Sequence, residues 1–168
     1  DIASIRRSRL KIVVDAMFGA GGGYLPRILA GGDVDVEEIN GDPNPAFPGI
    51  TQPEPIASNL VQLSALVRLS GADVGLAQDG DADRLGVVDE SGRYLTTLQV
   101  FPLLAHHLLR GRGERGPIVC TITMSSMVDR LGDDRYRAVW LAQGVGNANG
   151  IGLLDEGGGN DRYVAERD

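Results

Sequence analysis

The chain has 168 residues, of which 42% are hydrophobic, and its formal net charge is −7. This length predicts one domain, or one domain followed by part of another. The negative charge argues against nucleic acid and anionic membranes as general partners, and no stretch approaches the roughly 20 apolar residues of a membrane span.

Short apolar runs and helical periodicities alternate along the first two thirds of the chain. The expected strands are 10–16, 34–39, 72–78 and 84–90. The expected helices are 24–30, a helix capped by Ser58, and a strongly apolar one within 94–111. The apolar residues of the second helix share one face, namely Leu60, Leu63, Leu66 and Val67. This order predicts an α/β domain, a three-layer α/β/α sandwich with a mixed sheet covered by helices on both faces.

A polar, glycine-rich break at 111–116 is the expected domain boundary, which gives domains of 1–112 and 113–168. The second part begins with an expected strand at 117–123, continues with a short helix, and has another strand at 136–142. Two strands and a helix are too few to close a core, so we expect a partial second α/β unit. Cys120, the only cysteine, cannot form an internal disulfide, which favours a cytoplasmic location.

Two segments of unusual composition lie in the first third of the chain. The glycines at 19–23 suit a tight turn from strand to helix, and a phosphate cradle at the helix N-terminus is the alternative. The segment 40–55 holds five of the eight prolines and predicts a long irregular loop, which in a compact domain is usually functional. We expect Pro53, Glu54 and Pro55 to shape that loop.

Three aspartates, Asp79, Asp81 and Asp83, stand at alternate positions between two expected strands, and Arg84 follows them directly. Their alternation points all three carboxylates to one side of a turned loop, where mutual repulsion would raise their pKa values. A bound divalent cation removes that cost, and hard oxygen ligands suit Mg²⁺ or Ca²⁺. An arginine beside such an ion is suited to phosphate contact, so the loop predicts phosphoryl-transfer chemistry.

Two other interpretations of this loop are open. Counted from Asp79, an EF-hand would have Glu90 at position 12, but Arg84 stands at position 6, where the sharp turn needs glycine. The flanks also predict strands rather than helices. The second alternative is an exposed acidic turn that binds nothing.

The motif DGDADR at 79–84 resembles the metal-binding loop of the α-D-phosphohexomutases, the phosphoglucomutase and phosphomannomutase family. The strand, glycine turn and helix at 11–29 resemble the opening of that family's second domain. The proline-rich stretch at 41–60 resembles the segment ahead of its next helix. After residue 116, the chain resembles the start of the third domain, and DEGGG at 155–159 resembles its sugar-recognition loop.

This resemblance implies an enzyme that interconverts hexose 1-phosphates and 6-phosphates through a bisphosphate intermediate and a phosphoserine. It implies Mg²⁺ held by Asp79, Asp81 and Asp83, with Arg84 beside the transferring phosphate as a catalytic residue. It also implies that Glu156 binds hydroxyls of a phosphosugar substrate.

The chain departs from the family pattern in ways that bear on its activity. The phosphoserine loop of the first domain and the phosphate-binding fourth domain are not in this sequence, so both are expected partners and the chain alone is expected to be inactive. Gly157 stands where the family's recognition loop has serine. The chain is therefore interpreted as a fragment of a mutase that contributes the Mg²⁺ loop. The alternative is a non-catalytic metal-binding or protein-interaction module derived from that fold.

Overall fold

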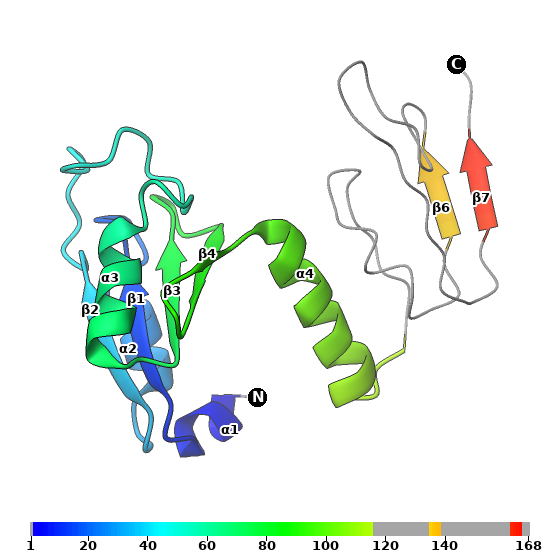
Figure 1. The fold of residues 1–168 in the computed structure, drawn as a ribbon, viewed down its shortest axis with the longest axis horizontal. Helices are drawn as coiled ribbons and strands as arrows, with labels where there is room; N and C mark the ends of the chain where they lie inside the picture. Colours follow the sequence, from blue (N-terminus) through cyan, green and yellow to red (C-terminus); the bar gives the residue numbers. More distant parts are fainter. Residues whose placement is uncertain (1, 116–134, 139–161, 166–168) are drawn as a thin grey trace. The chain divides into compact units, whose positions relative to one another are not determined.

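A computed structural model describes residues 2–115, 135–138 and 162–165, in two compact units, Asp1–Thr96 and Thr97–Asp168. Figure 1 shows the elements of both units. The first unit contains α1 (Ile2–Arg7), β1 (Lys11–Asp15), α2 (Tyr24–Leu29), β2 (Asp35–Ile39), α3 (Val61–Ser70), β3 (Val74–Gln78), β4 (Leu85–Asp89) and β5 (Tyr94–Leu95). The second contains α4 (Thr97–His106), the π-helix η1 (His107–Gly111), β6 (Arg135–Ala138) and β7 (Arg162–Ala165).

The first unit is built on one mixed sheet with the strand order β2-β1-β3-β4-β5. β1 runs parallel to both β2 and β3, whereas β3 and β4 form an antiparallel hairpin and β5 pairs antiparallel with β4. The carboxyl ends of β1, β2 and β3 therefore meet at one edge of the sheet. The glycine turn (19–23) follows β1, the proline-rich loop (40–55) follows β2, and the aspartate loop (79–84) follows β3.

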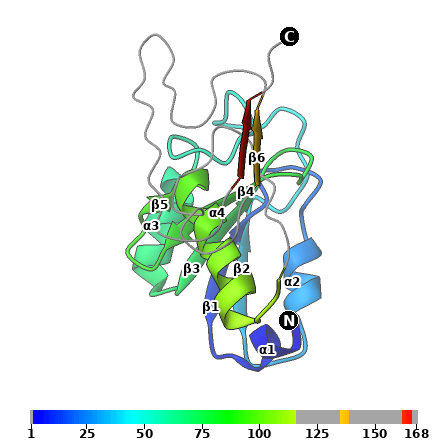
Figure 2. The ribbon, with the colours of Figure 1, turned by 90° about the vertical axis from the view of Figure 1, so that its right-hand side faces the viewer.

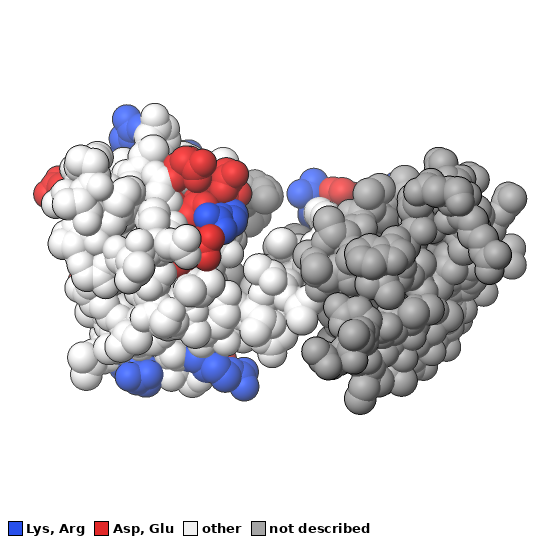
Figure 3. Space-filling model, turned by 90° about the horizontal axis from the view of Figure 1, so that it is seen from above, with Lys and Arg blue, Asp and Glu red and all other residues white. Residues whose placement is uncertain are grey.

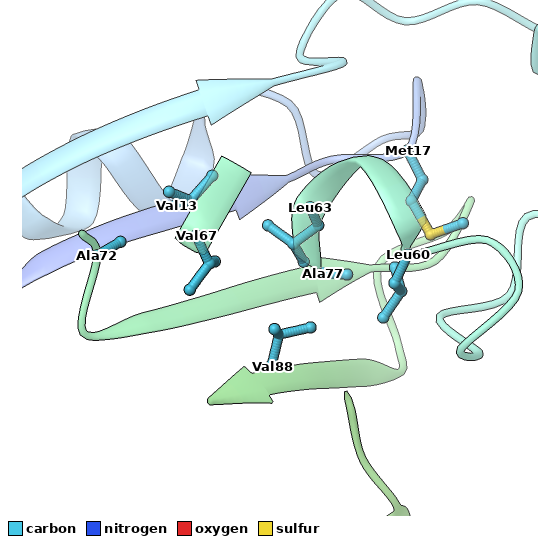
Figure 4. Close-up of a cluster of buried hydrophobic side chains, with 8 residues drawn as sticks. All are labelled: Val13, Met17, Leu60, Leu63, Val67, Ala72, Ala77 and Val88. Atoms are coloured by element: carbon cyan, nitrogen blue, oxygen red, sulfur yellow. The ribbon is translucent and has the colours of Figure 1, made fainter. Parts of the chain in front are cut away.

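Helices cover both faces of this sheet, as the sequence predicts, and Figures 1 and 2 show α2 and α3 on opposite sides of it. Alternate residues of β1 enter different layers of the core. Val13 packs with Leu63 and Val67 of α3, and Figure 4 shows this cluster. Ile12 and Val14 pack with Leu29 of α2. This period of two along a strand buried on both faces produces the three-layer α/β/α arrangement.

Most predicted elements of the first unit are present within one or two residues of their expected bounds. The predicted apolar face of α3 is confirmed, since Leu60, Leu63 and Val67 are fully buried and Leu66 packs against them. The predicted cap at Ser58 is wrong. A turn occupies the preceding residues, so the helix begins at Val61 after Leu60, without a side-chain cap.

Two elements of the first unit were not expected from the sequence. α1 is a six-residue helix whose residues are all at least partly exposed. It therefore has no buried apolar face that a sequence pattern could indicate. β5 has only two residues, and it exists through pairing with β4 across a tight turn in which Gly92 adopts a φ of 77°. Tyr94 and Leu95 therefore form a strand, whereas the sequence predicts them within the segment 94–111 that contains the following helix.

The second unit is described only in part. The two compact units divide after Thr96, so α4 belongs to the second unit. The sequence predicts a domain boundary after this helix, at 112/113, and that boundary stays a prediction. β6 overlaps the predicted strand at 136–142 and pairs in parallel with β7, which was not predicted. The predicted strand at 117–123 and the short helix after it lie outside the described residues. In the described part of the chain, no helix has the length and apolarity that crossing a membrane requires.

Candidate metal centre

The aspartate loop connects β3 to β4, whose pairing ends at Gln78 and Leu85. Both flanking elements are strands, so the EF-hand alternative is wrong, because an EF-hand loop lies between two helices. The loop lies at the carboxyl edge of the sheet. Figure 3 looks down on this side of the first unit and shows acidic side chains gathered around a basic one.

The three aspartates converge as their alternation predicts. One carboxylate oxygen from each of Asp79, Asp81 and Asp83 lies within 4.8 Å of the others. Asp79 is fully buried, and the other two are exposed. Three hard oxygen ligands from one short loop, open to solvent on one side, fit a divalent ion such as Mg²⁺ that keeps other positions for water or phosphate.

The turn of the loop depends on an unusual backbone conformation. Ala82 adopts a φ of 64°, in the left-handed region that is unfavourable for residues with a Cβ. Its N–H donates to the carbonyl of Asp79 at 3.1 Å, which closes the loop so that Asp83 comes back beside Asp79. The small side chain keeps this conformation accessible.

Asp79 is the fixed member of the set. Its Oδ1 accepts the backbone N–H groups of Asp83 at 2.9 Å and Arg84 at 3.0 Å, and its Oδ2 accepts Nε of Arg84 at 2.6 Å. Burial would raise the pKa of Asp79, but these donors outweigh it and hold that pKa below its ordinary value. Asp79 is therefore a preorganised carboxylate.

Asp83 responds to the crowding in the opposite direction. Its contact with the Asp79 carboxylate, followed by the charges of Asp81 and Asp79, raises the pKa of Asp83. Crowding by itself predicts a raised pKa for all three carboxyls. That expectation agrees with Asp83 and is wrong for Asp79, because Arg84 and two backbone donors stabilise the latter's charged form. A cation bound at the loop would relieve the repulsion at Asp83.

Arg84 joins the aspartate loop to the proline-rich loop. Its Nη1 donates to Oε1 of Glu54 at 3.0 Å, and its Nε lies 3.8 Å from Oδ1 of Asp83. The hydrogen bonds to Asp79 and then to Glu54 raise the pKa of Arg84 above its ordinary value. Glu54 was expected only to shape its loop, and no spacing in the sequence indicates that it pairs with an arginine 30 positions away.

The glycine turn packs directly on the aspartate loop. The N–H of Ala20 donates to the carbonyl of Gly80 at 2.9 Å, and a Cβ on Gly19 would lie only 2.6 Å from that same oxygen. The N–H of Gly23 donates to the Glu38 carboxylate at 2.9 and 3.0 Å. These contacts favour the structural role of the turn over the phosphate cradle, since close backbone approach requires the glycines and a carboxylate already occupies the N–H of Gly23.

The proline-rich loop supports the same site from the other side. The N–H of Gly80 donates to the carbonyl of Pro53 at 3.2 Å, and the ring of Pro53 and the side chain of Phe47 would be the nearest neighbours of a Cβ at position 80. Gly80 thus lies between the glycine turn and the proline-rich loop. The prediction that this long irregular loop is functional agrees with its contacts to the aspartate loop.

Asp15, at the end of β1, is a buried carboxyl that no motif in the sequence indicates. Its Oδ1 accepts the N–H of Met17 and Nδ2 of Asn40, both at 2.9 Å, and burial raises the pKa of Asp15. These bonds connect the ends of β1 and β2 beneath the loops. The other predicted site residue, Glu156, lies outside the described residues.

Comparisons with known proteins agree on one family. The profile described as "Phosphoglucomutase/phosphomannomutase, alpha/beta/alpha domain II" matches residues 1–92. A phosphoglucomutase/phosphomannomutase of Thermococcus kodakarensis is 40% identical over 131 residues, which are 78% of this chain and 28% of that protein. A probable phosphoglucosamine mutase of Methanococcoides burtonii is 36% identical over 128 residues, 76% of this chain and 29% of that protein.

A solved structure extends the likeness to three dimensions. A phosphoglucomutase/phosphomannomutase family protein from Burkholderia thailandensis superposes with a TM-score of 0.62 at 31% identity, covering 76% of this chain and 29% of that one. The chain therefore spans less than a third of the length of these relatives.

Proposed function

The chain belongs to the phosphoglucomutase/phosphomannomutase family, and from this premise we propose that it supplies the metal site of a phosphohexomutase. In that enzyme, a phosphoryl group moves between a serine and the 1- and 6-hydroxyls of a hexose phosphate. The observation that carries the proposal is the convergence of Asp79, Asp81 and Asp83 within 4.8 Å at the carboxyl edge of the sheet. Relatives are named for glucose, mannose and glucosamine phosphates, so the proposal names the substrate class and not one sugar.

The three carboxylates would hold Mg²⁺, which supplies charge stabilisation for the transferring phosphoryl group. Asp79 is suited to this role because it is ionised and fixed by three hydrogen bonds before any ion arrives. The exposed carboxylates of Asp81 and Asp83 complete the site from the solvent side. Preorganised ligands of this kind need little rearrangement when an ion binds.

Arg84 would contact the phosphate oxygens. Its side chain is 55% exposed although two carboxylates bind it, so the guanidinium can meet a ligand without being displaced from the loop. Each transfer exchanges one P–O ester bond for another: the bond to the donor oxygen breaks as the bond to the acceptor hydroxyl forms. The serine that donates first is proposed to come from another part of the full-length protein, because the family resemblance assigns it to a different domain.

The test is mutase activity of the full-length protein together with calorimetric Mg²⁺ titration of this chain, in the wild type and in Asp81→Asn. We expect Asp81→Asn to weaken Mg²⁺ binding and to reduce activity in parallel. Asp35→Asn is the matched control, since Asp35 is an exposed aspartate at the start of β2, at the other end of the sheet. A full-length protein that converts no hexose phosphate, or that works equally well with Asp81→Asn, would contradict the proposal.

A further inference from the structure

Carboxylates from two separate loops bind the guanidinium of Arg84. Asp79 accepts Nε at 2.6 Å and Glu54 accepts Nη1 at 3.0 Å. Two bonded nitrogens on a planar group fix both its position and its plane. Among the described residues, the hydrogen bonds and ion pairs of the Arg84 side chain use Nε and Nη1, so within this part of the chain Nη2 is open to a ligand.

The backbone around Glu54 is itself held in place. Nδ2 of Asn59 donates to the carbonyls of Gln52 and Glu54, both at 2.8 Å, and the N–H of Glu54 donates to the carbonyl of Gln52 at 2.7 Å. The carbonyl of Pro53 accepts the N–H of Gly80 in the aspartate loop. Glu54 therefore projects from a segment that is tied to the same loop that carries Arg84.

Without Glu54, the carboxylates that remain near Arg84 are those of Asp79 and Asp83 in the aspartate loop. Nε of Arg84 already lies 3.8 Å from Oδ1 of Asp83, so the guanidinium would be free to swing toward Asp83. Glu54 thus opposes a movement that would turn Arg84 away from a phosphate and toward Asp83, a second proposed metal ligand beside Asp79. A salt bridge this exposed contributes little to folding stability, which makes a role in orientation easier to separate from a role in stability.

We infer that Glu54 is a positioning residue, which holds the Arg84 guanidinium so that its free edge meets the transferring phosphate. This inference rests on the proposed function for its catalytic consequence, and on the contacts above for the orientation itself. Glu54 touches neither substrate nor metal in this scheme and acts only through Arg84.

The kinetic test uses the full-length protein and whichever of glucose, mannose or glucosamine 1-phosphate the wild type converts fastest. We expect Glu54→Ala to lower kcat/KM by about tenfold or more, while the melting temperature and the Mg²⁺ affinity stay close to wild type. Glu54→Gln, which keeps an oxygen acceptor, should recover part of the loss. Glu37→Ala, an exposed glutamate on β2, is the matched control and should have no effect.

A double-mutant cycle decides whether Glu54 works through its arginine. In an Arg84→Ala background, Glu54→Ala should cost almost nothing further, because the group that it positions is gone. An equal loss in both backgrounds would overturn the inference. So would a Glu54→Ala protein with wild-type kcat/KM.

A second measurement does not depend on activity. In this chain, ¹⁵N relaxation of the Arg84 Nε–H should show greater mobility in Glu54→Ala than in the wild type, with partial recovery in Glu54→Gln. Unchanged mobility would overturn the inference even if activity fell. If the full-length wild type has no mutase activity, the proposed function fails, and this measurement still decides whether Glu54 orients Arg84.

Discussion

Substitution of Gly19 by alanine tests whether the glycine turn sets the position of the metal loop. A Cβ at this position would lie 2.6 Å from the carbonyl oxygen of Gly80, and backbone atoms cannot swing aside as a side-chain end can. Restoring a separation of 3.0 to 3.4 Å requires a displacement of about 0.4–0.8 Å, which exceeds the tolerance of about 0.2 Å in metal–ligand distances. The aspartate loop, which contains Gly80, must absorb that displacement.

Two quantities should change together in Gly19→Ala. Overpacking of this kind destabilises by about 1–3 kcal/mol, measured as the free energy of unfolding in urea. The Mg²⁺ affinity, measured by calorimetry on the chain, should fall roughly 10–100-fold, the range typical of changes next to metal ligands.

The control is Gly111→Ala. Its new Cβ would approach only the side chain of His107, with Nδ1 nearest at 3.0 Å, and Gly111 belongs to the other compact unit. We expect this variant to bind Mg²⁺ with wild-type affinity. A Gly19→Ala chain with both unfolding free energy and Mg²⁺ affinity unchanged would refute the close packing of the two turns.

Three further predictions concern backbone strain, pH and the core. Ala82→Gly should raise the free energy of unfolding in urea by about 1–2 kcal/mol relative to Ala46→Gly. Ala46 is the control because it lies in an exposed loop and has no positive φ. Equal changes in the two variants would contradict the left-handed conformation at Ala82. Asp15 has a raised pKa when folded, so the folded state binds the extra proton and stability falls as pH rises from the ordinary carboxyl value through the folded pKa. Asp15→Asn keeps the Oδ1 acceptor, so it should gain stability at pH 7 and lose that advantage below about pH 3.8; a pH-independent difference would contradict the buried charge. Leu63→Ala should cost about 2–5 kcal/mol in thermal or urea unfolding, and a loss below 1 kcal/mol would be too small for a fully buried leucine.

Much of the first unit follows from the sequence, because its signals are local. The β-branched run before the glycine turn predicts β1, the spacing of Leu60, Leu63 and Val67 predicts the buried face of α3, and alternation predicts that three aspartates converge. Each of these depends on the geometry of one strand, one helix or one turn, which is the same in every protein. The site's chemical type could therefore be inferred before any packing was known.

The tertiary structure decided how that site is held. The pairing of Arg84 with Glu54 spans 30 positions, and the bond from Asn40 to Asp15 spans 25, so no local period marks either. The lowered pKa of Asp79 also depends on packing. Burial raises this pKa and hydrogen-bond donors lower it, and only the folded loop brings those donors to the carboxylate. Local conformation depends on neighbours along the chain, whereas hydrogen bonds between loops depend on which strands lie side by side in the sheet.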